Sequence, residues 1–197
     1  DFKYFRDEKI KFEVLTDTNT YTSRMLMLAT GSSSFVWNML ERHGYKIVAP
    51  CPSLFTFNLP QHPICKLMGL VVKQTMVAIQ NSKIVTEGPL LVTHWGLSGP
   101  AVLKASAWGA TILAERNYDF NVIIDWVPQT EVSDIHNLKE TLAKKKVISN
   151  AQFGLPSRLW QFLTEDVVSD TEKNWASLSK NEMEGIIRQL KRCPFQV

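Results

Sequence analysis

KIVTEGPLLVTHWGLSGPAVLKAS, residues 83–106, passes from a strand pattern through a tight turn into a helix pattern. The apolar run that ends at residue 92 is typical of a strand, and two glycines with a proline at 96–100 predict a turn. Ala101, Lys104 and Ala105 favour a short helix over 98–110, with Ser98 placed to cap it. A strand, a turn and a crossing helix therefore form the centre of the predicted fold.

Further short strands are predicted on both sides of this stretch, with Pro, Gly and Asn between them. They cover residues 45–50, 53–59, 69–80, 110–115 and 118–128. Short strands at such close intervals are typical of an antiparallel barrel or sandwich. The middle of the chain is therefore predicted to be a β region.

Residues 10–31 predict a hairpin that precedes the β region. Its first strand alternates apolar and charged residues, DTNT at 17–20 supplies a turn, and its second strand ends in a continuous apolar run at 25–29. We expect that run to be a buried strand, because both of its faces are apolar. A helix is expected over 34–44, with a glycine at its end.

The pattern changes after Pro128, where three segments carry a 3.6-residue apolar period. They cover residues 130–146, 156–168 and 179–193. Ser179 and Glu182 form a capping box at the start of the last one. The predicted fold class is multi-domain α+β, in which an antiparallel β-barrel is followed by a small all-α helical domain and preceded by a hairpin.

The composition is that of an ordinary folded protein, with 197 residues, 45% of them hydrophobic, and a net charge of +3. The dense run of lysines at 144–146 lies at a predicted helix end, where cations are favourable, so nucleic acid is not an expected partner. No apolar run reaches the roughly 20 residues that a membrane helix needs, so no membrane is expected either. The three cysteines and four histidines lack metal-ligand spacing; we expect no metal site, and free thiols in the cytoplasm.

LMLATGSSS, residues 26–34, is a candidate ligand-binding turn. A glycine directly after a buried strand lets the backbone approach a dinucleotide closely, and the residues concerned would be Ala29, Thr30 and Gly31. The same pattern is common in turns that bind nothing. The fingerprint G-x-G-x-x-G is absent from the sequence, so we expect no Rossmann-type pyrophosphate site and no bound cofactor within this chain.

His94 and Ser98 come nearest to the base and nucleophile of a hydrolase. The nucleophile elbow places a glycine two residues on either side of the serine, whereas Ser98 has Gly96 on one side and Pro100 on the other. No acidic residue is selected as the third member of a triad. A free-standing hydrolase stays an alternative, and no catalytic residue is predicted.

Five segments, in order, resemble aminoacetone-oxidase-like flavoproteins, an FAD-dependent oxidoreductase family described as NAD(FAD)-utilising dehydrogenases. These segments are KFEVLTDTNTYTSRMLMLATGSSS (11–34), LERHGYKIVAPCPSLFTFNLP (40–60), GLVVKQTMVAI (69–79), GPLLVTHWGLSGPAVLKAS (88–106) and LSKNEMEGIIRQLKRCPFQV (178–197). The most specific marks are HGYKIVAPCPSL at 43–54 and THWGLSGP at 93–100.

In that family a long insert, made of a β-barrel and a helical domain, interrupts the FAD-binding domain. The resemblance implies that residues 1–31 are the terminal hairpin of the FAD-binding domain's first half, 32–128 the barrel and 129–197 the all-α part. We therefore expect the chain to be the insert region of a larger bacterial, cytoplasmic oxidoreductase. It would form a lid or wall on the substrate side of the flavin and be inactive by itself.

The resemblance also implies partners and site residues. FAD would be the cofactor of the full-length protein, held mainly by the rest of its own FAD-binding domain, and a small molecule would be the substrate. The residues implied near the flavin are Ala29, Thr30 and Gly31; those implied in the substrate-side wall are His94, Gly96 and Ser98. The alternative is a protein- or RNA-interaction module with a mildly basic surface, although the sequence has no motif of interleaved aromatic and basic residues.

Overall fold

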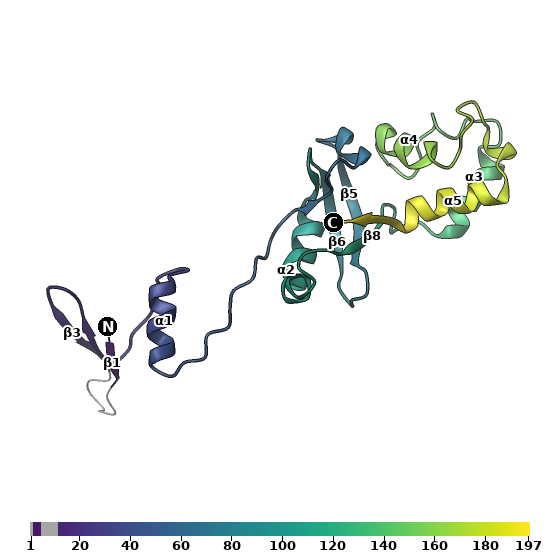
Figure 1. Cartoon of the computed structure of the whole chain (residues 1–197). Coiled ribbons are helices and arrows are strands. Elements are labelled where there is room, and N and C mark those ends of the chain that lie inside the picture. Colours follow the sequence, from purple (N-terminus) through teal and green to yellow (C-terminus); the bar gives the residue numbers. More distant parts are fainter. Residues whose placement is uncertain (1, 5–11) are drawn as a thin grey trace. The chain divides into compact units, whose positions relative to one another are not determined.

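The computed structural model describes residues 2–4 and 12–197 of the chain. The chain divides into two compact units, Asp1–Pro50 and Cys51–Val197 (Figure 1). This division reflects contacts within the chain, whereas the limits expected after residues 31 and 128 come from the resemblance to a family. The domain limits expected after residues 31 and 128 therefore stay predictions.

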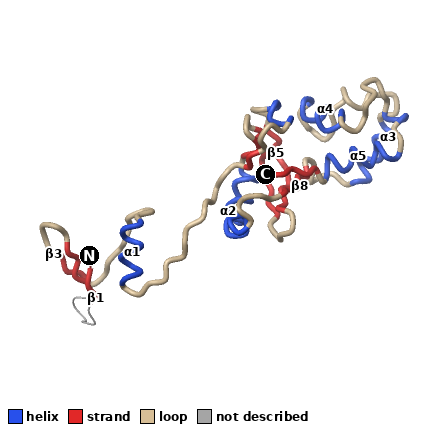
Figure 2. Tube along the Cα trace, viewed as in Figure 1, coloured by secondary structure: helices blue, strands red, loops and turns tan. Residues whose placement is uncertain are grey.

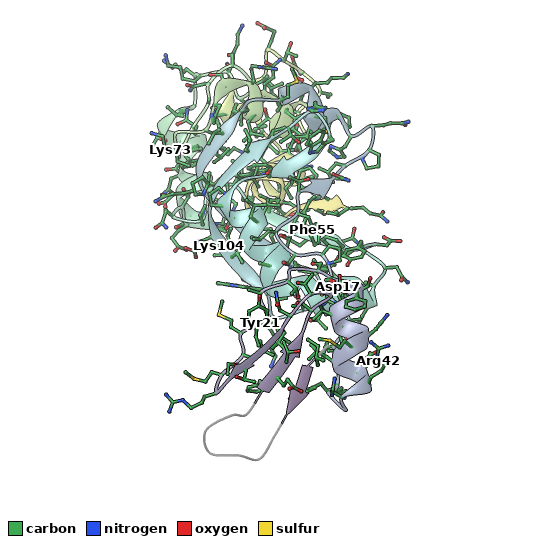
Figure 3. All side chains as sticks on the ribbon, turned by 90° about the vertical axis from the view of Figure 1, so that its left-hand side faces the viewer. Asp17, Tyr21, Arg42, Phe55, Lys73 and Lys104 are labelled. Atoms are coloured by element: carbon green, nitrogen blue, oxygen red, sulfur yellow. The ribbon has the colours of Figure 1, made fainter. Side chains whose placement is uncertain are left out.

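The first unit contains a three-stranded antiparallel sheet of order β1-β2-β3 and one helix. Its elements are β1 (Phe2–Tyr4), β2 (Phe12–Leu15), β3 (Thr20–Ser23) and α1 (Ser34–Arg42), and Figure 3 labels Tyr21 on β3 and Arg42 on α1. In the turn between β2 and β3, the N–H of Thr16 donates to the carbonyl of Asn19 over 2.8 Å. The hairpin and the helix expected here are confirmed in their described part, while residues 10 and 11 lie outside it.

The prediction of a buried strand at 25–29 is wrong. This segment has no regular secondary structure, and the side chains of Met25 and Met27 are 84% and 86% exposed. An apolar run is buried as a strand only where neighbouring strands and a covering layer meet it, and no described residue pairs with this one. The strand expected at 45–50 is also absent. The chain forms no helix or strand between α1 and β4 (Phe57–Asn58) (Figure 2).

The second unit is built on a curled six-stranded antiparallel sheet, a half-barrel of order β4-β7-β6-β5-β8-β9. Its other strands are β5 (Val71–Ile79), β6 (Val85–Val92), β7 (Gly96–Ser98), β8 (Asn121–Asp125) and β9 (Cys193–Gln196). β5 and β6 lie at two of the predicted strands and pair with each other as an antiparallel hairpin, and an irregularity between Val72 and Thr75 bends β5. The predicted antiparallel barrel followed by helices is confirmed.

Helix α2 (Pro100–Glu115) packs across β5, β6 and β7 (Figure 1). The hydroxyl of Thr86 donates to the carbonyl of Ala101 over 2.7 Å, which ties the start of the helix to β6. The helix continues through 110–115, so the strand predicted there is wrong. The reason is that the buried face of α2 keeps its helical spacing as far as Leu113, so the sheet stabilises the whole segment as a helix.

The helices expected after Pro128 are confirmed as α3 (Val132–Thr141), α4 (Ser157–Glu165) and α5 (Lys180–Lys191). The second unit also has two short 3₁₀ helices, η1 (Pro63–Leu67) between β4 and β5 and η2 (Trp175–Ser177) before α5. The sequence did not predict strand β9, which follows α5 directly (Figure 1) and pairs with β8, where Phe195 lies opposite Val122. The helices are thus inserted between two neighbouring strands of the sheet.

One core connects the half-barrel to the helices. Trp126 follows β8, Trp160 lies in α4 and Trp175 in η2, and all three are fully buried. The indole N–H of Trp160 donates to the carbonyl of Val147 over 2.8 Å. Packing in the core, as expected for the tryptophans of this chain, therefore explains these three, whereas Trp95 is 49% exposed.

The predicted capping box of α5 is present and gives the stability of the fold a dependence on pH. Glu182 accepts hydrogen bonds from the Lys173 ammonium at 2.8 and 3.0 Å, and from the N–H and hydroxyl of Ser179. These bonds, that from Lys173 foremost, lower the pKa of the Glu182 carboxyl from 4.5 to about 2. Because the folded state has the lower pKa, the stabilisation is complete above the unfolded value and is lost as the pH falls through the folded value.

We expect Glu182→Gln to lower the free energy of unfolding at neutral pH by about 1 kcal/mol, because the neutral amide keeps the capping box but loses the ion pair with Lys173. We also expect the difference from the unaltered protein to shrink toward acid pH, where the carboxylate is protonated. Urea unfolding at several pH values measures both effects, and Glu184→Gln on the exposed side of α5 is the control. A difference that does not change between neutral and acid pH would contradict the assignment.

Candidate functional site

The stretch 93–98 forms a tight turn followed by strand β7. The N–H and the hydroxyl of Thr93 donate to the carbonyl of Gly96 at 2.8 and 3.0 Å, which closes the turn. His94 and Trp95 lie at its exposed tip with their ring centroids 4.1 Å apart. The carbonyl of Trp95 accepts from the N–H of Leu59 over 2.7 Å, so the turn is anchored to the segment after β4.

Of the residues expected in the substrate-side wall, only His94 is exposed. Gly96 is buried in β7 opposite Asn58, and Ser98 is half-buried opposite Leu91 of β6. No hydrogen bond joins His94 to Ser98 in the described part of the chain. Ser98 does not cap α2 either, because the cap position is Gly99, which has φ +95° and offers no side chain.

The residues expected near the flavin lie in the first unit. Ala29, Thr30 and Gly31 are exposed and irregular, and a Cβ added to Gly31 would meet no atom within 4 Å. The backbone around Gly31 is therefore open to an approaching ligand, and the role of these residues near the flavin stays a prediction.

A cavity of about 430 Å³ lies where η1 and α4 meet. η1 contributes His62 and Lys66, and α4 contributes Arg158 and Phe162. The guanidinium of Arg158 donates from Nη2 to the carbonyl of Lys66 over 2.9 Å, which ties the two helices together. We call this feature the junction cavity. Its walls combine aromatic rings, cations and, at the end of α4, the carboxylates of Glu165 and Asp166.

His62 is held rigidly at the edge of the junction cavity. Its Nδ1 accepts the N–H of Ile64 over 3.2 Å, and its ring meets Phe162 and Phe195 at centroid distances of 6.3 and 5.1 Å. Partial burial lowers the pKa of His62 below 6.5, and the nearby charge of Asp166 opposes that shift only in part. The neutral ring therefore carries its proton on Nε2, which can donate to a ligand.

Sequence reasoning treated His62 as a lone histidine and missed this cavity. Its two sides come from residues about 100 positions apart, as the bond between Arg158 and Lys66 illustrates. Neither side carries a motif, and His62 and Phe162 become neighbours only when α4 docks on the half-barrel. No periodicity or residue spacing within η1 or α4 predicts that the two helices contact each other.

Other kinds of site find no support in residues 2–4 and 12–197. No group of three or more His, Cys, Asp and Glu side chains is placed there to hold a metal ion, and no helix is both long and apolar enough to cross a membrane. All three cysteines are free. Burial raises the pKa of the Cys65 thiol, and that of Cys193 to about 11, so neither is a ready thiolate nucleophile at neutral pH.

The chain is similar in sequence to known proteins over nearly its whole length. A sequence model described as "HI0933-like protein barrel and H2TH domain" matches residues 51–197, which is the second unit of the structure. The chain is also 26% identical over 201 residues to a ribosomal RNA dihydrouridine synthase of Haemophilus influenzae. That match covers 96% of this chain and 47% of the relative, so the chain spans about half the relative's length.

The matched residues are those of the half-barrel and its inserted helices, and the resemblance to an FAD-dependent oxidoreductase family is confirmed at the level of the family. This chain therefore belongs to the HI0933-like family of FAD-binding, oxidoreductase-like proteins, and residues 51–197 are its barrel and H2TH domain.

Proposed function

We propose that this chain is the substrate-side insert of an FAD-dependent oxidoreductase that reduces uridine in ribosomal RNA. The observation that carries the proposal is the match along 96% of the chain to a protein named for that activity. Dihydrouridine differs from uridine by two hydrogens, so its formation is a two-electron reduction. A reduced flavin supplies this chemistry when bound, with a nicotinamide nucleotide as the source of electrons.

In this proposal the flavin is held by parts of the protein other than this chain. Support comes from the sequence, which has no G-x-G-x-x-G fingerprint to place a helix N-terminus against pyrophosphate. The half-barrel would then close the substrate side of the flavin. His94, with Trp95 beside it, is the wall residue best exposed for contact with a substrate, and Gly96 and Ser98 would shape the turn beneath it.

The substrate proposed here departs from the small molecule expected from the sequence. The relative's name favours a ribosomal RNA, and an enzyme that acts on one base in RNA needs a surface for an unstacked nucleotide. A module that only binds RNA or protein is not favoured, because the family is one of FAD-binding, oxidoreductase-like proteins. A bacterial, cytoplasmic location stays part of the proposal and agrees with the three free thiols.

The test uses the full-length protein that contains this chain. We expect it to purify with FAD and, given reduced nicotinamide nucleotide, to form dihydrouridine in ribosomal RNA from cells that lack its gene. Nucleoside digestion with mass spectrometry measures the product. The chain of 197 residues alone is the control and is expected to bind no FAD and to form no product. If the full-length protein binds FAD but forms no dihydrouridine, the proposed substrate is wrong. If it contains no FAD, the proposed FAD-dependent reaction is wrong.

A further inference from the structure

We propose that the junction cavity binds one unstacked nucleotide of an RNA chain, with the base against Phe162 and the phosphate at Lys66 and Arg158. This inference rests on the RNA substrate proposed above and names the part of the chain that would hold it. The cavity of about 430 Å³ falls within the roughly 300–1,000 Å³ of pockets that enclose small ligands.

The aromatic wall of the cavity is fixed before any ligand arrives. Phe162 is half-buried and packs edge-on against His62, whose ring is held in turn by Phe195 and by the N–H of Ile64. Bases of single-stranded RNA are commonly held by stacking on such rings. A rigid wall of this kind lets a base stack without first ordering the side chain that receives it.

The cationic side of the cavity contains one charge that is free to meet a phosphate. Arg158 is partly engaged by the carbonyl of Lys66, whereas the Lys66 ammonium is exposed and has no hydrogen bond or ion pair with any residue that the structure describes. Arginine and lysine are the usual phosphate-binding residues of proteins that bind nucleic acid. This side of the cavity therefore suits a phosphodiester.

The carboxylates of the cavity make it a poor match for a simple anion. Glu165 accepts a hydrogen bond from the amide of Gln161, whereas the carboxylate of Asp166 accepts none from the residues that the structure describes. Free phosphate would be attracted by Lys66 and Arg158 and would gain nothing from the two carboxylates. A ligand with both an anion and an N–H donor can pair with the cations and with the carboxylates of the cavity. A uridine nucleotide is such a ligand, because its phosphate is the anion and N3 of its uracil ring carries the N–H. The uracil carbonyls beside N3 can accept from His62 Nε2.

The experiment measures binding of a fluorescein-labelled oligouridylate to the chain by fluorescence anisotropy, over a range of salt concentrations. We expect Phe162→Leu to raise the Kd about tenfold, because a stacked base is lost while the apolar packing remains. We expect Lys66→Gln to lower the slope of log affinity against log salt by about 0.7, the value for one phosphate contact on a single strand. Lys144→Gln removes the same charge from the exposed end of the 144–146 run and should change neither quantity.

Competition separates a nucleotide site from an anion site. Uridine 5′-monophosphate is expected to displace the labelled RNA at concentrations where inorganic phosphate does not; equal competition by phosphate would overturn the proposal. Unchanged binding in both Phe162→Leu and Lys66→Gln would also overturn it, and so would absence of any RNA binding. Lys66 is exposed, so its variant tests the site even if Phe162→Leu unfolds the protein.

The two proposals fail in different ways. If cavity-dependent RNA binding is found but the full-length protein forms no dihydrouridine, the reaction is wrong and the nucleotide site stands. If the full-length protein forms dihydrouridine equally well with Phe162→Leu and Lys66→Gln, the reaction stands and the nucleotide site is wrong.

Discussion

Gly96→Ala is expected to destabilise the second unit by about 4 kcal/mol or more, among the largest effects of a single substitution. A Cβ at this position would lie 2.0 Å from the carbonyl oxygen of Phe57 and 2.9 Å from the N–H nitrogen of Leu59. Both neighbours are backbone atoms, so no side-chain rotation can relieve the overlap. The pairing of β4 with β7 must open instead, and with it the anchor of the turn that carries His94 and Trp95.

Gly69→Ala is the matched control for this prediction. Gly69 also has a positive φ, +85°, but a Cβ there would meet nothing within 4 Å. We expect a cost of about 1–2 kcal/mol, the usual penalty for a left-handed backbone conformation in a residue with a side chain. Denaturant unfolding followed by the fluorescence of the buried tryptophans Trp126, Trp160 and Trp175 compares the two variants. Equal losses in both would contradict the close approach of β4 to Gly96.

Lys191→Met is expected to lower the free energy of unfolding by about 3 kcal/mol, because it leaves a largely buried carboxylate without its cationic partner. The Lys191 ammonium lies 2.8 Å from Asp125 Oδ2 and donates to the carbonyls of Val127 and Thr130 at 3.0 and 2.9 Å. The two charged side chains are only 17% and 15% exposed. The pair joins the end of α5 to the end of β8, so its loss loosens the helices from the half-barrel.

A double-mutant cycle separates the ion pair from the packing of the lysine stem. Asp125→Asn added to Lys191→Met should cost less than the two single changes together, since no unpaired buried charge remains. Lys180→Met, on the same helix, is the control: its ammonium lies 3.8 Å from Glu184 with 87% and 59% of the two side chains exposed. Its effect should stay within about 0.5 kcal/mol, as for surface pairs in general. Strict additivity of the Lys191 and Asp125 changes would show that their coupling is absent.

Local patterns predicted the parts of the fold that local interactions stabilise. Strands β5 and β6 follow from two β-rich runs on either side of a short polar segment, and the capping box at Ser179 follows from two residues three positions apart. Local patterns gave the wrong secondary structure where a short segment is compatible with both a strand and a helix. Residues 110–115 have strand-like composition, yet the buried face that begins earlier in α2 carries the helix through them.

Strand β9 and the junction cavity depend on residues far apart in the chain. β9 contains a proline and follows α5 without a turn, so only its pairing with β8 makes it a strand. His62 likewise acquires its neighbours Phe162 and Phe195 from segments about 100 or more positions away. No short window of sequence contains either pairing.

By itself the sequence determined the family, the short strands of an antiparallel barrel, the helices after them and the absence of a glycine-rich dinucleotide fingerprint, because each of these shows in patterns of residues close together in the chain. Only the tertiary structure decided that the helices are inserted between β8 and β9, that Gly96 supports a close backbone approach, and that rings and charges meet at one cavity. The physical reason is that burial and side-chain pairing act through space, and they assign a role to a residue only after distant segments have packed together.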